Sequence, residues 1–374
     1  MKNDIHILLI SSWYPNEQKP FLGNFIQRQS ELLATKYKVT VIDTISDSNL
    51  NDIQLNSVNK DNLTEVQVKH PRGRHIFQRR KHQKKALKTA MEGIGKVDLV
   101  IGSILLPKGL QFIQAKKHFA CPLIYIEHGS YFRPEVSESW KQIYRLIWKK
   151  VSFNVDAIVA VSEFLKKDLQ GFFPKHKINV IGNHVDLKLF EAKEKTVNDK
   201  TQFLHVSTLD FQTKKPEGII EACEKLKSKS DNFNLTIVCD EDISEWEELV
   251  AKKNLKSNIT FVGPLEWKEL VPYYQQADAF VLFSTYETFS IVLVEAWLTG
   301  TPTITTPVGV AWSMPESNGM IVSQNNSDEL ADSMLKFINN EIQFNSSEIR
   351  EHAKQFGSEK ILIQWMELIE QYVK

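Results

Sequence analysis

The segment from Phe280 to Gly309, FVLFSTYETFSIVLVEAWLTGTPTITTPVG, constrains the fold of this chain more than any other. Its apolar run Phe280–Phe283 predicts a buried strand, and a polar loop follows. An apolar helix is predicted over 289–299, and it stops at Gly300 before a second short strand. Such a strand–loop–helix–strand unit is typical of an open α/β sheet, which binds ligands at the carboxyl ends of its strands. The loop is therefore a predicted ligand site.

Two carboxylates lie around the start of this predicted helix. Glu287 lies in the loop, and Glu295 follows after seven intervening residues. Eight helical steps of about 100° place Glu295 about two turns along the helix, with Glu287 above its N-terminus. The N–H groups there, on Phe289, Ser290 and Ile291, suit a phosphate. The carboxylates suit sugar or ribose hydroxyls, since an ionised acid only accepts hydrogen bonds.

The alternation of strand and helix patterns runs through the chain twice. The first series of strands starts at His6–Ile10 and ends at Ile178–Ile181, and the second runs from Phe203–Ser207 to Met320–Val322. Strict alternation predicts two parallel sheets with right-handed crossovers. Within the first half, residues 46–62 are predicted to be irregular and residues 138–151 to form one helix. A polar linker is expected over 193–200, and an amphipathic helix over 358–372.

Composition limits the class of protein. A chain of 374 residues is long enough for two domains, and its 46 basic and 46 acidic side chains argue against a general nucleic-acid coat. The three cysteines form no C-x-x-C pair, which favours a reducing cytosol. The apolar run near the N-terminus is too short for a signal peptide or a membrane span. We expect a cytoplasmic protein, either soluble or peripheral on the inner face of the plasma membrane.

The Glu287-x7-Glu295 segment resembles the signature of the retaining GT-B glycosyltransferases of family 4, whose pattern reads E-G-F-G-L-x-x-x-E-A-x-A-x-G-x-P. Here Thr288 and Ser290 replace the two glycines, while Gly300 and Pro302 match. The resemblance covers nearly the whole chain and implies two Rossmann-like domains that face each other across a cleft. It implies an acceptor-binding domain over 1–190, a donor-binding domain over 191–355, and a C-terminal helix over 356–374 that crosses back to the first domain.

The resemblance implies transfer of a hexose from a nucleotide-diphosphate sugar to a hydroxyl of a glycan or lipid-linked acceptor, with retention of the anomeric configuration. Such an activity serves polysaccharide, lipopolysaccharide or glycolipid synthesis. Glu287 is then expected to hold the donor sugar, and Glu295 the nucleotide ribose. No side-chain nucleophile is evident, so the family implies a front-face route. The alternatives are another GT-B enzyme, such as a nucleotide-sugar epimerase, or a non-catalytic sugar-nucleotide-binding protein.

Two motifs of the first half fit this family. The loop that reaches Gly23 and Asn24 resembles its N-terminal glycine loop, where a glycine lets the backbone approach a ligand. The motif Glu127-His128-Gly129 ends a predicted strand, and the family resemblance places His128 near the transferred sugar. A plain βα loop and a core histidine are the alternatives.

The diphosphate-binding motif departs from the family pattern. The family carries an Arg and a Lys, because the leaving diphosphate needs positive charge as the bond breaks. Here Thr208 occupies the Arg position, and Lys214, with Lys215 beside it, matches the Lys. Lys214 and the helix start at Phe289–Ile291 must then hold the diphosphate. Gly263 and Pro264 match a segment whose backbone contacts the nucleobase in the family.

The Asp240-x-Asp242 pair has the form of a metal motif of other glycosyltransferases, but it leads into a predicted helix. We expect an acidic turn there, no metal and no cofactor besides the donor.

The basic stretch 69–88 carries nine Lys or Arg and three His without an acid. It suits an anionic membrane surface or a lipid-diphosphate acceptor, and a solvated helix face is the alternative. Nothing resembles a nucleic-acid-binding fold, so no nucleic-acid partner is expected.

Overall fold

The computed structural model describes residues 5–140, 142–196, 198–240 and 242–373. The chain divides into two compact units. The first comprises the chain up to Val161, Leu165–His184 and the residues from Ile361 on, and the second comprises Ser162–Phe164 and Val185–Lys360. Within the described ranges, no helix has the length and apolar character needed to cross a membrane.

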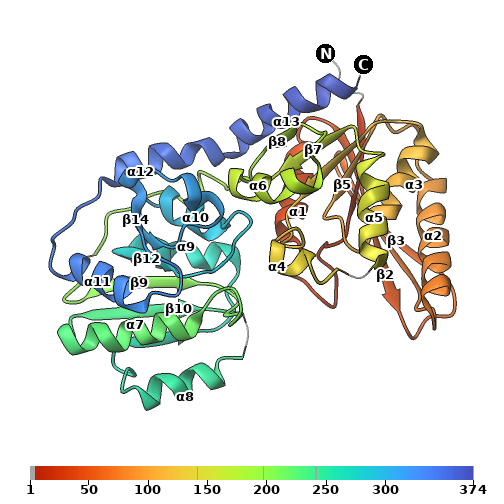
Figure 1. The fold of residues 1–374 in the computed structure, drawn as a ribbon. Coiled ribbons are helices and arrows are strands. Elements are labelled where there is room, and N and C mark those ends of the chain that lie inside the picture. Colours follow the sequence, from red (N-terminus) through yellow and green to blue (C-terminus); the bar gives the residue numbers. More distant parts are fainter. Residues whose placement is uncertain (1–4, 141, 197, 241, 374) are drawn as a thin grey trace. The chain divides into compact units, whose positions relative to one another are not determined.

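The first unit is built on an eight-stranded sheet with the order β3-β4-β2-β1-β5-β6-β7-β8 (Figure 1). All neighbouring strands are parallel except β3 and β4. The strands are β1 His6–Ser11, β2 Lys38–Asp47, β3 Gln54–Lys60, β4 Leu63–Pro71, β5 Leu99–Ser103, β6 Leu123–Glu127, β7 Ala157–Ala160 and β8 Ile178–Val180.

The prediction that residues 46–62 are irregular is wrong, and so is the prediction that every strand is parallel. Strand β2 continues to Asp47, and β3 pairs antiparallel with β4 at the edge of the sheet. Every residue of β3 is exposed, so the segment lacks the apolar alternation that marks a half-buried strand. Its extended form depends on backbone pairing with β4, which composition does not reveal.

The helices of the first unit are α1 Asn24–Ala34, α2 Ile76–Glu92, α3 Gly109–Phe119, α4 Pro134–Ser137, α5 Gln142–Ser152, from Leu165 on α6 Glu163–Phe172 and, from Ile361 on, α13 Ser358–Tyr372. The helix predicted over 138–151 is confirmed as α5, which is described from Gln142 on, and the short α4 precedes it. Trp140 lies between them and packs its ring against Phe132 and Phe172. The prediction of a helix over 358–372 is confirmed.

The second unit has a six-stranded, fully parallel sheet with the order β11-β10-β9-β12-β13-β14 (Figure 1). Its strands are β9 Thr201–Val206, β10 Phe233–Val238, β11 Ile259–Val262, β12 Ala279–Leu282, β13 Thr303–Thr305 and β14 Gly319–Ile321. Its helices are α7 Pro216–Lys229, α8 Ser244–Lys252, α9 Trp267–Gln276, α10 Ile291–Leu298, α11 Ser327–Ile338 and α12 Ser346–Ala353. Sequence analysis did not predict α12, which the Asn345 side chain caps.

The central helix starts later than predicted. Helix α10 begins at Ile291 rather than Phe289, because Ser290 has φ 72° and ψ 72°, in the left-handed region. Glu295 therefore lies about one turn into the helix, and the predicted two turns are wrong.

Each sheet has one point at which the strand order reverses. In the first unit the chain builds outward from β1 through β2 on one side and from β5 on the other. In the second unit the reversal lies between β9 and β12. Open α/β sheets bind ligands outside the carboxyl ends of the strands at such a switch point, so a ligand site is expected there in each unit.

Candidate functional site

Two loops meet at the switch point of the second unit. One follows β9 and the other follows β12. The Thr285 amide donates to the Thr213 carbonyl at 2.8 Å, and its hydroxyl donates to the Gln212 carbonyl at 3.1 Å. These two bonds fix the loop of Lys214 against the loop of Glu287.

An ion pair joins the two loops. Lys214 Nζ lies 2.5 Å from Glu287 Oε1, and the Ser284 hydroxyl donates to the same oxygen at 2.8 Å. The side chains of Lys214 and Glu287 are 21% and 12% exposed, so both reach solvent. Glu287 Oε2 accepts no hydrogen bond within the described residues. The pair thus leaves a carboxylate oxygen and ammonium protons available to a ligand that carries hydroxyls and phosphate.

His205 supports the first of these loops, and sequence analysis missed it. One ring nitrogen lies 2.8 Å from the Val281 carbonyl and the other 2.7 Å from the Ser207 hydroxyl. Burial lowers the pKa of His205 to about 4, against the contact with Val281, and the Lys214 charge lowers it further. The imidazole is therefore neutral at pH 7. A histidine inside the apolar strand pattern FLHV was the available signal.

The start of α10 offers backbone donors. The N–H groups of Phe289, Ser290 and Ile291 make no hydrogen bond within the described residues, as expected for the first turn of a helix. The Phe289 carbonyl accepts from the Val310 amide at 2.8 Å. Gly309 permits this contact, since a Cβ there would lie 2.5 Å from the Phe289 oxygen. Three N–H groups and the positive end of a helix suit an anion.

Ser290 is strained where the family pattern has glycine. Its backbone lies in the left-handed region, which disfavours residues with a Cβ. Its hydroxyl is buried and has no hydrogen-bond partner within the described residues.

Glu295 is held from two sides. Trp267 Nε1 donates to Glu295 Oε1 at 2.5 Å, and the Tyr274 hydroxyl donates to Oε2 at 2.9 Å. Burial and the nearby Glu295 charge raise the pKa of Tyr274 well above its ordinary value, so the hydroxyl stays protonated as a donor. Glu295 is 3% exposed, so these two side chains hold it inside the second unit. Its assignment to a ribose stays a prediction.

The remaining residues predicted for the donor lie at the surface of the second unit. Thr208 follows β9, and Gly263 and Pro264 follow β11; all three are exposed. Lys215 caps α7 in a left-handed conformation and lies 3.9 Å from Glu217.

The acidic turn after β10 leads into a helix. Asp242 Oδ1 accepts from the Ser244 amide at 3.0 Å and from its hydroxyl at 2.7 Å, at the first residue of α8. Residue 241 lies outside the described residues. Among those described, no three His, Cys, Asp or Glu are grouped as metal ligands would be.

In the first unit, Gly23 makes the turn that starts α1. Its φ is 72°, and a Cβ there would lie 2.8 Å from the Trp13 backbone, so only glycine fits. Asn24 is the first residue of α1. Gly23 thus lies against the Trp13 backbone, and its approach to a ligand stays a prediction.

His128 follows directly after β6 and is buried. Its ring lies 4.9 Å from that of Phe25, between centroids. Neither ring nitrogen has a hydrogen-bond partner within the described residues. Burial lowers the pKa of His128 to about 3, and the nearby Asn183 side chain offsets this only in part. The neutral ring therefore carries one donor and one acceptor nitrogen, both buried, with the Asn183 side chain nearby.

Glu127, the neighbour of His128, is a fully buried carboxylate. It accepts from the Tyr125 hydroxyl and from the amides of Leu105, His128 and Gly129. Burial raises the pKa of Glu127 in spite of these donors. The Glu127 carboxylate thus fixes the backbone of the motif at His128 and Gly129.

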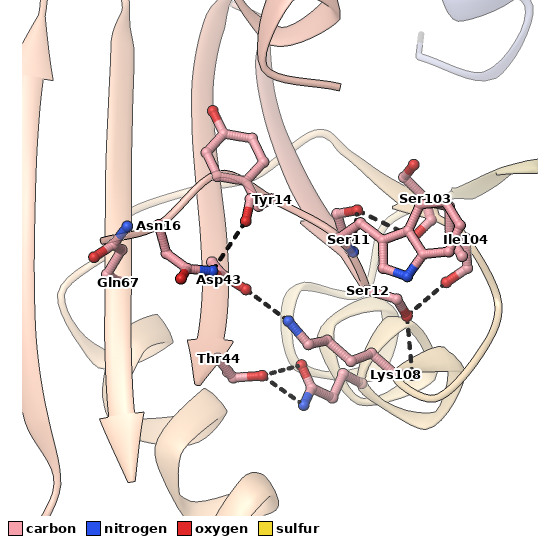
Figure 2. A network of polar contacts seen from close by, with 12 residues as sticks. Ser11, Ser12, Tyr14, Asn16, Asp43, Thr44, Gln67, Ser103, Ile104 and Lys108 are labelled. Atoms are coloured by element: carbon pink, nitrogen blue, oxygen red, sulfur yellow. Dashed lines mark hydrogen bonds and ion pairs between the residues drawn. The ribbon is translucent and has the colours of Figure 1, made fainter. Parts of the chain in front are cut away.

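A second ion pair lies at the carboxyl ends of β1, β2 and β5 (Figure 2). Lys108 Nζ lies 2.6 Å from Asp43 Oδ1, and these side chains are 9% and 5% exposed. The Ser12 hydroxyl donates to the Ile104 carbonyl at 2.8 Å and accepts from the Lys108 amide at 3.1 Å. Sequence analysis missed this network, because no motif joins residues so far apart in the chain.

The comparisons with known proteins agree with this architecture. The model described as "Glycosyl transferases group 1" matches residues 188–360, and the model "Glycosyltransferase Family 4" matches residues 23–189. An uncharacterized glycosyltransferase of Methanocaldococcus jannaschii is 29% identical over 191 residues, which cover 46% of this chain and 48% of the relative. The match thus spans about half of that relative's own length.

Solved structures share the fold over the whole chain. Sucrose-phosphate synthase from Thermosynechococcus elongatus has a TM-score of 0.78 at 21% identity, covering 98% of both chains. HepE of Anabaena, solved in complex with UDP, has a TM-score of 0.70 at 17% identity, covering 98% of this chain and 100% of that one.

Proposed function

We propose that this chain, which belongs to the GT-B glycosyltransferases related to family 4, moves a hexose from a nucleotide-diphosphate sugar to an acceptor hydroxyl and retains the anomeric configuration. The observation that carries the proposal is the site at the switch point of the second unit. There, the Lys214–Glu287 pair and the free N–H groups at the start of α10 offer charge and donors for a diphosphate beside a carboxylate for sugar hydroxyls.

In this proposal Lys214 and the amides of Phe289, Ser290 and Ile291 hold the diphosphate. They stabilise the negative charge that develops as the bond from the anomeric carbon to the phosphate oxygen breaks. The Lys214 ammonium has protons beyond the one directed at Glu287, and the helix start adds a positive dipole. Together they stand in for the Arg that Thr208 replaces.

Glu287 is proposed to hold hydroxyls of the donor sugar through Oε2, and Glu295 the ribose hydroxyls. Thr208, Lys215, Gly263 and Pro264 are proposed to complete the nucleotide site. In a front-face reaction the acceptor oxygen bonds to the anomeric carbon on the side that the phosphate leaves. The acceptor proton then passes to the departing phosphate oxygen, so no side-chain nucleophile is needed.

The first unit is proposed to recognise the transferred sugar and the acceptor. The neutral imidazole of His128 has one donor and one acceptor nitrogen, both suited to hydroxyls. Gly23 and Asn24, at the turn that starts α1, are proposed to border the acceptor and the donor phosphate. Polysaccharide, lipopolysaccharide or glycolipid synthesis is the proposed setting.

A cytoplasmic location at an anionic membrane surface is a further part of this proposal, with residues 69–88 as the contact. No cofactor besides the donor is proposed, and no metal, because Asp242 is engaged with Ser244. Transfer is therefore expected to continue in EDTA, and a metal requirement would contradict this part.

The test begins with the donor. Purified protein is screened by thermal shift against nucleotide diphosphates and their sugars, with UDP compounds first, because binding raises the melting temperature by mass action. Nucleotide release is then measured with and without glycan or lipid acceptors. Acceptor-dependent release with retained anomeric configuration supports the proposal. Release without any acceptor would instead indicate an epimerase, and inversion would remove the front-face route.

A further inference from the structure

A groove runs along the first unit, with α3 as its floor and α2 and α5 as its walls. Figure 1 shows the three helices on one flank of the unit's sheet. The groove encloses about 560 Å³, within the range of ligand sites. Leu110 and Ile113 line its floor with apolar surface.

Four cations surround this apolar floor. They are Arg80 and Lys84 from α2, Lys117 from α3 and Lys150 from α5. None of the four forms an ion pair within the described residues, and no acidic side chain lines the groove. Arg80 is half-buried and the three lysines are exposed. Their unneutralised positive charge converges from three helices and attracts anions to the groove.

Exposed apolar side chains lie beside the cations. On α2, Ile76 and Phe77 are 50% and 75% exposed, and they lie four and three residues before Arg80, on the same side of the helix. On the other wall, Leu146 is 56% exposed and lies one turn before Lys150. Phe153, at 85% exposure, follows α5 directly and lies one turn after Lys150.

We propose that the groove between α2, α3 and α5 binds the phosphate headgroup of an anionic membrane lipid, and that Phe77 and Phe153 insert into the bilayer interface. The inference rests on the proposed contact with a membrane, not on the proposed catalysis. Basic residues around an apolar face match an anionic bilayer surface in charge and in polarity. The aliphatic side chains of Ile76 and Leu146 favour lipid over nucleic acid, since bases stack on aromatic rings and guanidinium planes, whereas a bilayer interface takes up aliphatic side chains.

The inference differs from attraction by the basic stretch alone. Lys117 and Lys150 lie outside residues 69–88, yet they line the same groove. Lys81 and Lys85 lie inside that stretch and are exposed, but they do not line the groove. A headgroup site requires Lys117 and Lys150, whereas diffuse attraction depends equally on Lys81 and Lys85.

The experiment measures co-sedimentation of the full chain with phosphatidylcholine vesicles that contain or lack phosphatidylglycerol. Reversal of Lys117 and Lys150 to Glu, or of Arg80 and Lys84 to Glu, is expected to lower the partition coefficient for anionic vesicles at least about tenfold. The matched reversal of Lys81 and Lys85 changes net charge equally and is expected to lower it by less than about threefold. Circular dichroism confirms that each variant is folded.

The outcomes separate the two proposals. An equal partition coefficient for vesicles with and without phosphatidylglycerol overturns both the anionic membrane contact and the headgroup site in the groove. Equal losses from the Lys81/Lys85 and the Lys117/Lys150 variants leave the membrane contact in place and overturn the groove. Retention of single-stranded RNA, with no vesicle binding, overturns the groove as a lipid site.

A second measurement places the aromatic side chains. The three native cysteines are buried, and burial raises the pKa of the Cys121 thiol to about 11 and of Cys223 to about 12. An exposed Phe77→Cys or Phe153→Cys is therefore labelled selectively with a polarity-sensitive fluorophore. We expect blue-shifted emission on anionic vesicles, and none for a label at Ile363→Cys, an exposed position on α13. No shift at either Phe position overturns the insertion.

Discussion

Each unit has a lysine–carboxylate pair at the switch point of its sheet, but the two pairs differ in their contact with solvent. Asp43 and Lys108 in the first unit are 5% and 9% exposed, whereas Glu287 and Lys214 in the second are 12% and 21% exposed. Desolvated charges depend on each other, because loss of one leaves the other buried without compensation. The first pair is therefore expected to maintain the fold, and the second to serve a ligand.

The two units also place their glutamates in similar surroundings. Glu127 and Glu295 are both buried, and each accepts from a buried tyrosine, Tyr125 or Tyr274. The other donors to Glu127 are backbone amides, whereas the other donor to Glu295 is the Trp267 side chain. Glu127 thus fixes the strand end before His128, and Glu295 fixes α10 against α9. A buried carboxylate alone therefore does not mark a ligand contact.

The largest effect is expected from Lys108→Met. Removing one partner of a buried pair should lower the free energy of unfolding by about 3–5 kcal/mol, because Asp43 stays desolvated without its counter-charge. Urea denaturation measures the loss. The double variant with Asp43→Asn should recover most of it, and a single-variant loss below about 1 kcal/mol would show that the pair is not structural.

Lys214→Ala should leave stability within about 1 kcal/mol, since Glu287 keeps the Ser284 hydroxyl and reaches solvent. Acceptor-dependent transfer should fall by about 10²–10³-fold, as when one charge-stabilising donor is lost. Initial rates and urea denaturation on the same preparation check both statements. Lys252→Ala, on the exposed face of α8, is the matched control. Unchanged transfer in Lys214→Ala and Glu287→Gln would remove this site from the reaction.

The buried histidines make both units sensitive to acid. The pKa values of His128 and His205 are lowered to about 3 and about 4, so between pH 6.5 and these values only the unfolded chain takes up the proton. Stability is full above pH 6.5 and decreases as the pH falls. Between pH 7 and pH 5, the unfolding free energy of His205→Gln should fall by about 2 kcal/mol less than that of the wild type. Urea denaturation at each pH measures the unfolding free energy of both proteins. If the two proteins lose the same free energy between pH 7 and pH 5, His205 is not a neutral buried residue.

The smallest effect is expected from Ser290→Gly. Glycine relieves the left-handed strain and removes the buried hydroxyl that has no partner. It also raises the conformational entropy of the unfolded chain, which offsets part of this gain. We expect a gain of about 1 kcal/mol in unfolding free energy. Gly309→Ala is the opposite control and should lose stability, because its Cβ would lie 2.5 Å from the Phe289 carbonyl. A loss of stability in Ser290→Gly would mean that the hydroxyl has a structural role.

The segment around Glu287 and Glu295 was predictable because its strand, loop, helix and second strand are adjacent in sequence. The start of the helix was not predictable, because Ser290 has a left-handed conformation that its residue type does not favour, next to a Phe289 carbonyl that accepts from the distant Val310 amide. Strand β3 was missed for a related reason, since its exposed side chains follow no pattern and its pairing with β4 holds it extended.

By itself, the sequence determined two successive α/β sheets, the resemblance to a glycosyltransferase family, and the loop that carries Glu287, because hydrophobic period, glycines and motif order are local properties of the chain. Only the tertiary structure decided that Lys214 pairs with Glu287, that Lys108 is buried against Asp43, and that cations from three helices surround one groove. These contacts join residues from separate loops or separate helices. Their charges become structural or accessible only through the burial that packing creates.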